Sequence, residues 1–205
     1  MKEKNKISQV LDWTYDKAIN GLGHLESAEE LAQTYLRREG SLEDKINSFI
    51  RWQNTKCFTS GFLSGLGGLI TMPVTIPANV SSVLYVQVRM CATIAVMGGY
   101  DAKDDRVRTL VYACLLGNGI KDVLKNMGIV FGNKLSKVAI KKISFEAIKK
   151  INQRIGFRLI TKFGEKGILN LGKAIPVVGG LIGGTFDLVS SNAVGNVARN
   201  TFATA

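Results

Sequence analysis

The chain has 205 residues, with 27 Lys or Arg against 16 Asp or Glu, so its net charge at neutral pH is +11. Its single histidine and its three widely spaced cysteines argue against a metal centre, a histidine-based catalytic triad and a disulfide framework. A charge of this sign and size indicates an anionic partner, such as a phospholipid surface, a nucleic acid or an acidic protein. We therefore assign no metal, no cofactor and no catalytic residue from the sequence.

The N-terminal segment, 1–25, predicts a helix that precedes a main domain over 26–205. Its basic start is typical of a signal peptide, but Asp12 and Asp16 interrupt any apolar segment that could follow. We therefore expect the chain to begin in the cytosol.

Helix starts are marked by a serine or aspartate followed three residues later by an acid, the pattern of a capping box. Three such starts are expected, at Ser27–Glu30, Ser41–Asp44 and Asp101–Asp104. Apolar residues then recur at helical spacing, and glycines stand where these helices should end. No segment shows the sustained alternation of a β-strand, so the sequence predicts an all-α fold.

An uncharged run of 32 residues, Cys57–Val88, is the most prominent apolar feature of the chain. Pro73 and Pro77 divide it, because the residue before a proline avoids the helical conformation. We predict a short helix over 58–71 and a second helix over 78–97. The first is shorter than the roughly 20 residues that a membrane span needs, and the second holds several polar side chains. The run is therefore expected to form a buried or interfacial helical hairpin.

A second Gly-rich apolar segment, Ala174–Ala198, has Asp187 as its only charge. We expect it to pack against the first run. A buried Asp187 would have to pair with a cation or stay neutral, and Arg89 or Arg199 is the natural partner. Alternatively, an acid and amides line a ligand cavity between the helices. The residues of this candidate polar cluster are Asn79, Gln87, Arg89, Asp187, Asn192 and Arg199.

The region 134–166 is strongly basic, with ten Lys or Arg side chains and two Glu. Its apolar residues recur at helical spacing, which predicts a basic amphipathic helix of the kind that anionic membrane surfaces attract. Alternatively, it is a surface helix whose long cationic side chains cover the edge of the core. The candidate residues for an anionic surface are Lys149, Lys150, Arg154, Arg158 and Lys162. Together, these features predict a single bundle-like domain with two Gly-rich apolar hairpins packed together and a basic amphipathic helix.

Several motifs occur in an order that resembles the EcsC family of bacterial proteins, over about Glu26 to Phe202. They are the glycine-proline block 60–90, Gly99–Asp101 with Arg106 and Arg108 behind it, and Ile175–Gly179. The family takes its name from a protein encoded beside an ABC transporter. The resemblance implies a bacterial, mainly helical protein associated with membranes, and it supplies no established reaction and no settled catalytic residues.

From these features we expect a cytoplasmic accessory or regulatory protein, peripheral to the inner face of the cell membrane, which binds anionic lipid surfaces and possesses a surface for a membrane-protein partner. The alternative is a soluble helical module that binds an apolar or lipid-like ligand between its two hairpins. Nucleic-acid binding is not expected, because the basic region lacks interleaved aromatic residues and the chain lacks a helix-turn-helix pattern. The sequence does not predict an oligomeric state.

Overall fold

The computed structural model of the chain describes residues 2–56, 78–117, 120, 125, 137–163 and 181–203. Side chains are described for 9–55, 82–117, 120, 125, 138, 140–156 and 191–203. Within this part of the chain the regular elements are helices, and Leu22 and Leu25 form an isolated bridge. The predicted all-α fold is confirmed.

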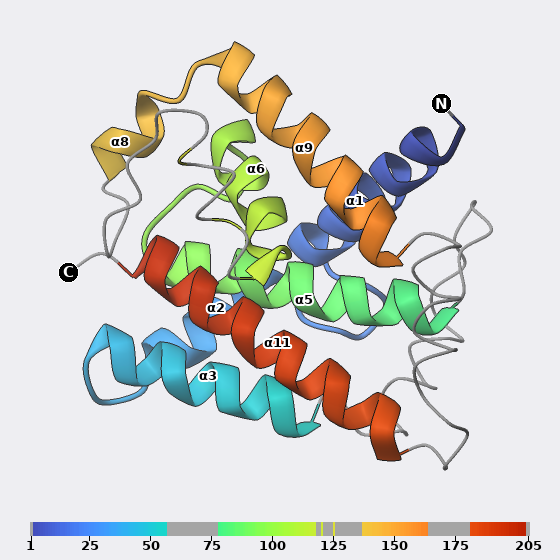
Figure 1. Cartoon of the computed structure of the whole chain (residues 1–205). Helices are drawn as coiled ribbons and strands as arrows, with labels where there is room; N and C mark the ends of the chain where they lie inside the picture. Colours follow the sequence, from blue (N-terminus) through green and yellow to red (C-terminus); the bar gives the residue numbers. More distant parts are fainter. Residues whose placement is uncertain are drawn as a thin grey trace.

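The described helices keep the labels of Figure 1. They are α1 (Lys2–Asn20), α2 (Ala28–Leu36), α3 (Leu42–Lys56), α5 (Ala78–Met97), α6 (Asp105–Cys114), α8 (Lys137–Lys141), α9 (Phe145–Phe163) and α11 (Leu181–Phe202). The helix predicted over 78–97 is therefore confirmed to the residue. The helix predicted over 58–71 and the prolines that follow it lie outside the described residues. None of the described helices combines the length and the apolar character that a membrane span requires.

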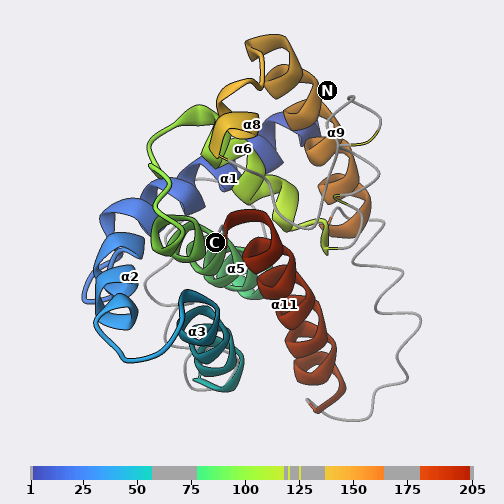
Figure 2. The ribbon, with the colours of Figure 1, turned by 90° about the vertical axis from the view of Figure 1, so that its left-hand side faces the viewer.

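Helix α5 lies at the centre of the molecule, where α1, α2, α3, α6 and α11 all pack against it. Helix α9 lies across α1 and α6, and α8 contacts α6. Figures 1 and 2 show α6, α8 and α9 on one side of α5, with α3 and α11 on the other. Buried side chains of α1, among them Leu11 and Tyr15, belong to the same apolar core as those of α5 and α9. The N-terminal helix is thus packed into the body of the fold.

Two helices begin at the predicted capping boxes. The hydroxyl of Ser27 accepts a hydrogen bond from the backbone N–H of Glu30, and the Glu30 carboxylate accepts one from the backbone N–H of Ser27. Ser41 and Asp44 make the same reciprocal pair at the start of α3. Each pair satisfies donors that the first turn of a helix leaves without intrahelical partners.

The third predicted start, at Asp101, is wrong by three residues. Asp104 is the N-cap of α6, and its side chain accepts a hydrogen bond from the backbone N–H of Arg106 at 2.7 Å. The carboxylate of Asp101 instead accepts from the backbone N–H of Lys103 at 2.8 Å, and its carbonyl accepts from the N–H of Asp104. Asp101 therefore closes a turn that precedes the helix, and a second aspartate provides the cap.

The packing between α5 and α11 is very close. A Cβ added at Gly98, just beyond α5, would overlap the backbone carbonyl oxygen of Phe202 at the end of α11. A Cβ added at Gly195 of α11 would lie 3.0 Å from Cγ2 of Ile50 and 3.3 Å from Cε of Met90. Small residues permit this approach, as they do in other tight helix pairs. The predicted packing of the helix after Pro77 against the C-terminal segment is confirmed.

Cys91 of α5 and Cys114 of α6 are buried free thiols. Burial raises the pKa of the Cys91 thiol well above its usual value, and a hydrogen bond with Cys114 adds to the effect. Cys114 also contacts Oγ1 of Thr201 on α11, at 3.8 Å. The interpretation of the cysteines as small buried residues is confirmed for these two, and Cys57 lies outside the described residues.

Candidate functional site

Gln87 and Arg89, two members of the predicted polar cluster, point to different sides of α5, because residues two apart on a helix are rotated by about 200°. The buried Gln87 donates from Nε2 to Oγ of Ser191 on α11, at 2.9 Å. The buried Arg89 instead lies within electrostatic range of Glu30 on α2. Hydrogen bonds from Ser27 lower the pKa of the Glu30 carboxyl, and the Arg89 guanidinium adds to that effect.

Arg199 and Asn192 make separate contacts with α3. Arg199 donates from Nη1 to Oδ1 of Asn47 at 2.5 Å, and the exposed Asn192 accepts from Nδ2 of Asn54 at 3.2 Å. The described members of the predicted cluster therefore do not meet at one point. The side chains of Asn79 and Asp187 lie outside the described residues.

Ser191 was not predicted to be a member of the polar cluster, because a serine within an apolar helix has no sequence pattern that marks it as a hydrogen-bond partner. Its hydroxyl satisfies an amide that would be costly to bury alone. The Gln87–Ser191 hydrogen bond joins α5 to α11, and the Arg199–Asn47 hydrogen bond joins α11 to α3. These contacts are suited to fixing the register of α3, α5 and α11.

The basic region forms an amphipathic helix, as predicted. Ile148, Ile151 and Ile155 of α9 are buried in the core. The basic face, as we name it, consists of exposed cations on α8, the following turn and α9: Lys141, Lys142, Lys149, Lys150 and Arg154. Arg158 and Lys162 lie further along α9, and their side chains are outside the described residues. Three of the five predicted surface residues, Lys149, Lys150 and Arg154, are thus exposed on α9.

Two large apolar side chains are exposed beside these cations. Phe145, the first residue of α9, is 75% exposed, and Val138 of α8 is 62% exposed. Neither residue stands out in the sequence, because each lies within a few positions of apolar residues, such as Ile140 and Ile148, that are buried in the core. A phenylalanine left in water on a surface rich in lysine is typical of a contact site.

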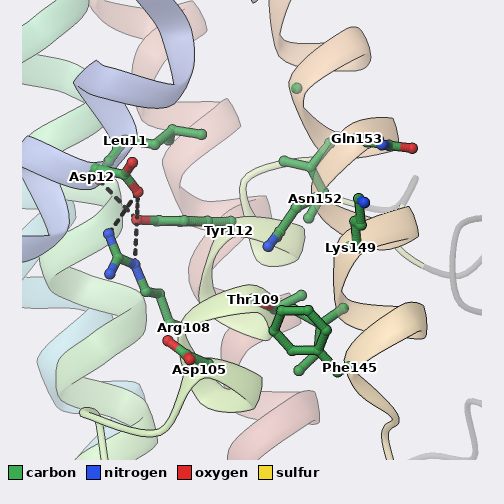
Figure 3. A pocket seen from close by; sticks show the side chains of 13 residues that line it. Leu11, Asp12, Asp105, Arg108, Thr109, Tyr112, Phe145, Lys149, Asn152 and Gln153 are labelled. Carbon is green, nitrogen blue, oxygen red and sulfur yellow. Dashed lines mark hydrogen bonds and ion pairs between the residues drawn. The ribbon is translucent and has the colours of Figure 1, made fainter. Parts of the chain in front are cut away.

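A cavity of about 540 Å³ opens between α1, α6 and α9 (Figure 3). Leu11, Ile148 and Ile155 provide apolar walls, and Phe145 stands at its edge. Its polar lining includes side chains from all three helices: Asp12, Asp105, Arg108, Lys149, Asn152 and Gln153. This cavity lies beside α9, away from the seam between the two apolar segments where the sequence analysis placed a ligand space.

One wall of the cavity is held by a hydrogen-bond network around Tyr112. Arg108 donates from Nη2 to the carboxylate of Asp12 at 2.6 Å and from Nε to the Tyr112 hydroxyl at 2.9 Å. That hydroxyl donates to the carbonyl oxygen of Leu11 at 3.0 Å. The Tyr15 ring packs edge-on against Tyr112, with centroids 5.5 Å apart.

Burial raises the pKa of Tyr112 well above its ordinary value, although the neighbouring Arg108 opposes the shift. The phenol therefore stays protonated and acts as a hydrogen-bonding strut. Arg108 and Tyr112 are four residues apart on α6, a spacing that places two side chains on one helix face. Their meeting with Asp12, 96 positions away from Arg108, was not visible in the sequence.

In the part of the chain that the structure describes, no group of three or more His, Cys, Asp or Glu side chains is arranged to hold a metal ion.

Comparison with known proteins gives one match. The model of the EcsC protein family matches residues 2–204, which includes α1 as well as the segment that carries the sequence motifs. No curated protein and no solved structure matches the chain. Because the match covers nearly the whole length, the chain belongs to the EcsC protein family.

Proposed function

We propose that the protein is a peripheral membrane protein that binds anionic phospholipid surfaces through α8 and the N-terminal half of α9. The observation that carries this proposal is the exposure of Phe145, at 75%, one helical turn before the exposed Lys149 of α9. Val138 of α8, at 62% exposed, is a second exposed apolar side chain near the cations of the basic face in the sequence. Exposed cations alone would suit a nucleic acid equally well, but an exposed aromatic ring and an exposed valine favour a surface with an acyl layer.

The expected strength follows from these side chains. Each Lys or Arg near an anionic leaflet contributes about 1 kcal/mol, and the attraction falls off within a Debye length of about 8 Å at physiological salt. Insertion of Phe145 into the interface contributes up to about 2 kcal/mol, if most of its exposed surface is buried. Binding of this strength is reversible and sensitive to salt. We place the protein in the cytoplasm, at the inner face of the cell membrane, where anionic lipids and a membrane-protein partner are both available.

Vesicle flotation tests the proposal. The full-length protein should float with phosphatidylcholine vesicles that contain phosphatidylglycerol, and only weakly with phosphatidylcholine alone. High salt should release most of it. The variant Lys142→Glu/Lys150→Glu/Arg154→Glu reverses three cations of the basic face and should weaken partitioning at least about tenfold. Phe145→Ser should weaken it at every salt concentration, since the lost contribution is not electrostatic.

A matched control carries the same change in net charge on other faces. Arg37, Arg38 and Arg51 are exposed cations on α3 or just after α2, and neither helix packs against α8 or α9. Their reversal to Glu should leave partitioning within about twofold of the unaltered protein. Equal losses in the two triple variants would show that only net charge matters and would contradict a defined binding face. Failure of the unaltered protein to bind anionic vesicles at low salt, or preferential retention of a labelled DNA duplex, would overturn the proposal.

A further inference from the structure

We infer that the cavity between α1, α6 and α9 binds a zwitterionic headgroup in which a primary ammonium is joined to a phosphate through a short linker, as in phosphatidylethanolamine. This inference rests on the proposed function, because it assigns to the membrane-facing side of α9 a particular lipid chemistry. Its first support is size. At about 540 Å³, the cavity falls within the usual range of about 300–1,000 Å³ for small-molecule sites.

The second support is the arrangement of charge in the lining. Asp12 and Arg108 are 2.6 Å apart and neutralise each other, so they contribute little net charge to a ligand. Asp105 and Lys149 also line the cavity, and neither has an ion-pair partner among the described residues. Figure 3 shows Asp105 on α6 and Lys149 on α9, on opposite sides of the space.

A ligand of one sign fits this lining poorly. A bare phosphate near Lys149 would also face the carboxylate of Asp105, and a simple ammonium would face Lys149. A zwitterion satisfies both, with its phosphate toward Lys149 and its ammonium toward Asp105. Opposite charges within a few ångströms favour each other more strongly at a partly enclosed site than in bulk water.

The remaining lining agrees with this assignment. Asn152 of α9 supplies an amide donor that points toward Tyr112 and the space in Figure 3, where it can bond phosphate oxygens. The amide of Gln153 points away from that space in the same view. Leu11, Ile148 and Ile155 form an apolar floor for the linker and the glycerol carbons. A primary ammonium has three N–H donors for Asp105, whereas the methylated ammonium of choline has none. The site should therefore prefer ethanolamine over choline.

Phe145 connects the cavity to the bilayer. The same side chain lines the cavity and is 75% exposed, so the cavity opens beside the apolar contact of the proposed membrane face. A headgroup can enter from the interface while its acyl chains remain in the membrane. Phe145 and Lys149 are four residues apart on α9 and lie on one face of the helix. Insertion of Phe145 would therefore bring Lys149 close to the lipid phosphates.

Calorimetric titration of the full-length protein with soluble glycerophosphoethanolamine tests the site without any membrane. We expect binding that exceeds that of glycerophosphocholine and of inorganic phosphate. Asp105→Asn should weaken binding of glycerophosphoethanolamine about fivefold. It should strengthen the weak binding of phosphate, because the repelling carboxylate is removed. Lys149→Gln should weaken both by a similar factor. The matched controls Glu146→Gln and Lys150→Gln alter exposed charges on α9 that do not line the cavity and should change neither.

A second arm asks whether the ligand comes from a lipid. Vesicles with a fixed fraction of phosphatidylglycerol should bind the protein more tightly when phosphatidylethanolamine replaces part of the phosphatidylcholine, and Asp105→Asn should remove that gain. Preference in both arms supports a lipid source; preference in the soluble arm alone supports the site with the free headgroup as its ligand. Equal binding of the ethanolamine and choline compounds, or an unchanged affinity in Asp105→Asn, would overturn the inference.

The two proposals fail separately. The triple variant Lys142→Glu/Lys150→Glu/Arg154→Glu leaves the cavity lining intact and should still bind glycerophosphoethanolamine in solution. If the unaltered protein does not bind anionic vesicles but binds glycerophosphoethanolamine in solution, the proposed membrane function is wrong and the cavity site is supported. If it binds anionic vesicles without any headgroup preference in either arm, the cavity inference is wrong.

Discussion

The seam between α5 and α11 and the seam between α6 and α9 use glycine in opposite ways. At the first, an added Cβ at Gly98 would meet the backbone of Phe202, and one at Gly195 would meet Met90 of α5 and Ile50 of the adjoining α3. The missing side chains therefore let neighbouring helices approach closely. At the second, Gly156 of α9 has nothing within 4 Å of an added Cβ, and it borders the cavity.

The difference separates a structural role from a binding role. Close packing without voids gives dispersion contacts and a unique register, which suits the centre of the fold. Open space bordered by charges and amides contributes little to stability but can admit a ligand. Four substitutions sharpen or break this contrast, and they follow in order of expected effect.

The largest effect is expected for Gly98→Ala. Its methyl group would meet a backbone oxygen of Phe202, which cannot rotate away as the tip of a side chain can. We expect a loss of more than about 3 kcal/mol in the free energy of unfolding, measured by urea denaturation, or a chain that does not fold. A midpoint unchanged from that of the unaltered protein would show that the two helix ends are not in contact.

Gly195→Ala should be less damaging. Its new methyl group would press on side-chain atoms of Ile50 and Met90, which can shift, so a loss of about 1–3 kcal/mol is expected. A double-mutant cycle with Ile50→Ala isolates the contact. Removal of the Ile50 side chain should make room for the alanine, so the double variant should lose less stability than the two single losses together. Strict additivity would contradict direct contact.

Tyr112→Phe tests the wall of the open seam. It removes hydrogen bonds to Arg108 and to the Leu11 carbonyl, so we expect a loss of about 1–2 kcal/mol in the free energy of unfolding at neutral pH. Tyr15→Phe is a suitable comparison, since it removes a different buried hydrogen bond, from the Tyr15 hydroxyl to the carbonyl of Ala102, and leaves the hydrogen bonds of Tyr112 in place. A gain in stability for Tyr112→Phe would mean that the network is not formed.

The same phenol contributes to the loss of stability in alkali, as does Tyr15, whose pKa is also raised by burial. Because the pKa of Tyr112 in the folded protein is raised above its unfolded value of 10.0, the folded state keeps a proton that the unfolded state releases. Its stabilising contribution is complete below about pH 10 and decreases as the pH rises further. Unfolding midpoints measured across this interval should therefore fall less steeply for Tyr112→Phe than for the unaltered protein.

The smallest effect is expected for Gly156→Ala. With free space around the new methyl group, the higher helix propensity of alanine should dominate and stabilise the fold by up to about 1 kcal/mol. Thermal unfolding would detect the change. A loss of stability comparable to that of Gly195→Ala would remove the contrast between the two seams.

Local features of the fold could be predicted from the sequence, because their causes are local. Ser27 and Glu30 cap a helix through atoms three residues apart, and the stripe of Ile148, Ile151 and Ile155 follows from helical periodicity. The wrong start at Asp101 has a local cause as well. Two aspartates three residues apart can both accept backbone N–H groups, and their spacing does not decide which one begins the helix.

The candidate site depends on contacts that spacing does not encode. Arg108 reaches Asp12 from 96 positions away, and the cavity exists only because α9 crosses both α1 and α6. The exposure of Phe145 is likewise a property of the assembled fold. From the sequence alone, this residue could equally have been buried with Ile148 and Ile151 of the same helix. Membership of the EcsC family was visible from motifs in order, but those motifs did not indicate the cavity.

The hydrogen-bonded thiols of Cys91 and Cys114 have a practical consequence. Both are enclosed at the centre of the molecule, so a reagent in solution cannot modify them while α5, α6 and α11 remain together. In a Cys57→Ser chain, the rate at which these two thiols react with such a reagent would measure the rate at which the core opens. The two native thiols can thus report the opening of the core, and no further cysteine has to be introduced.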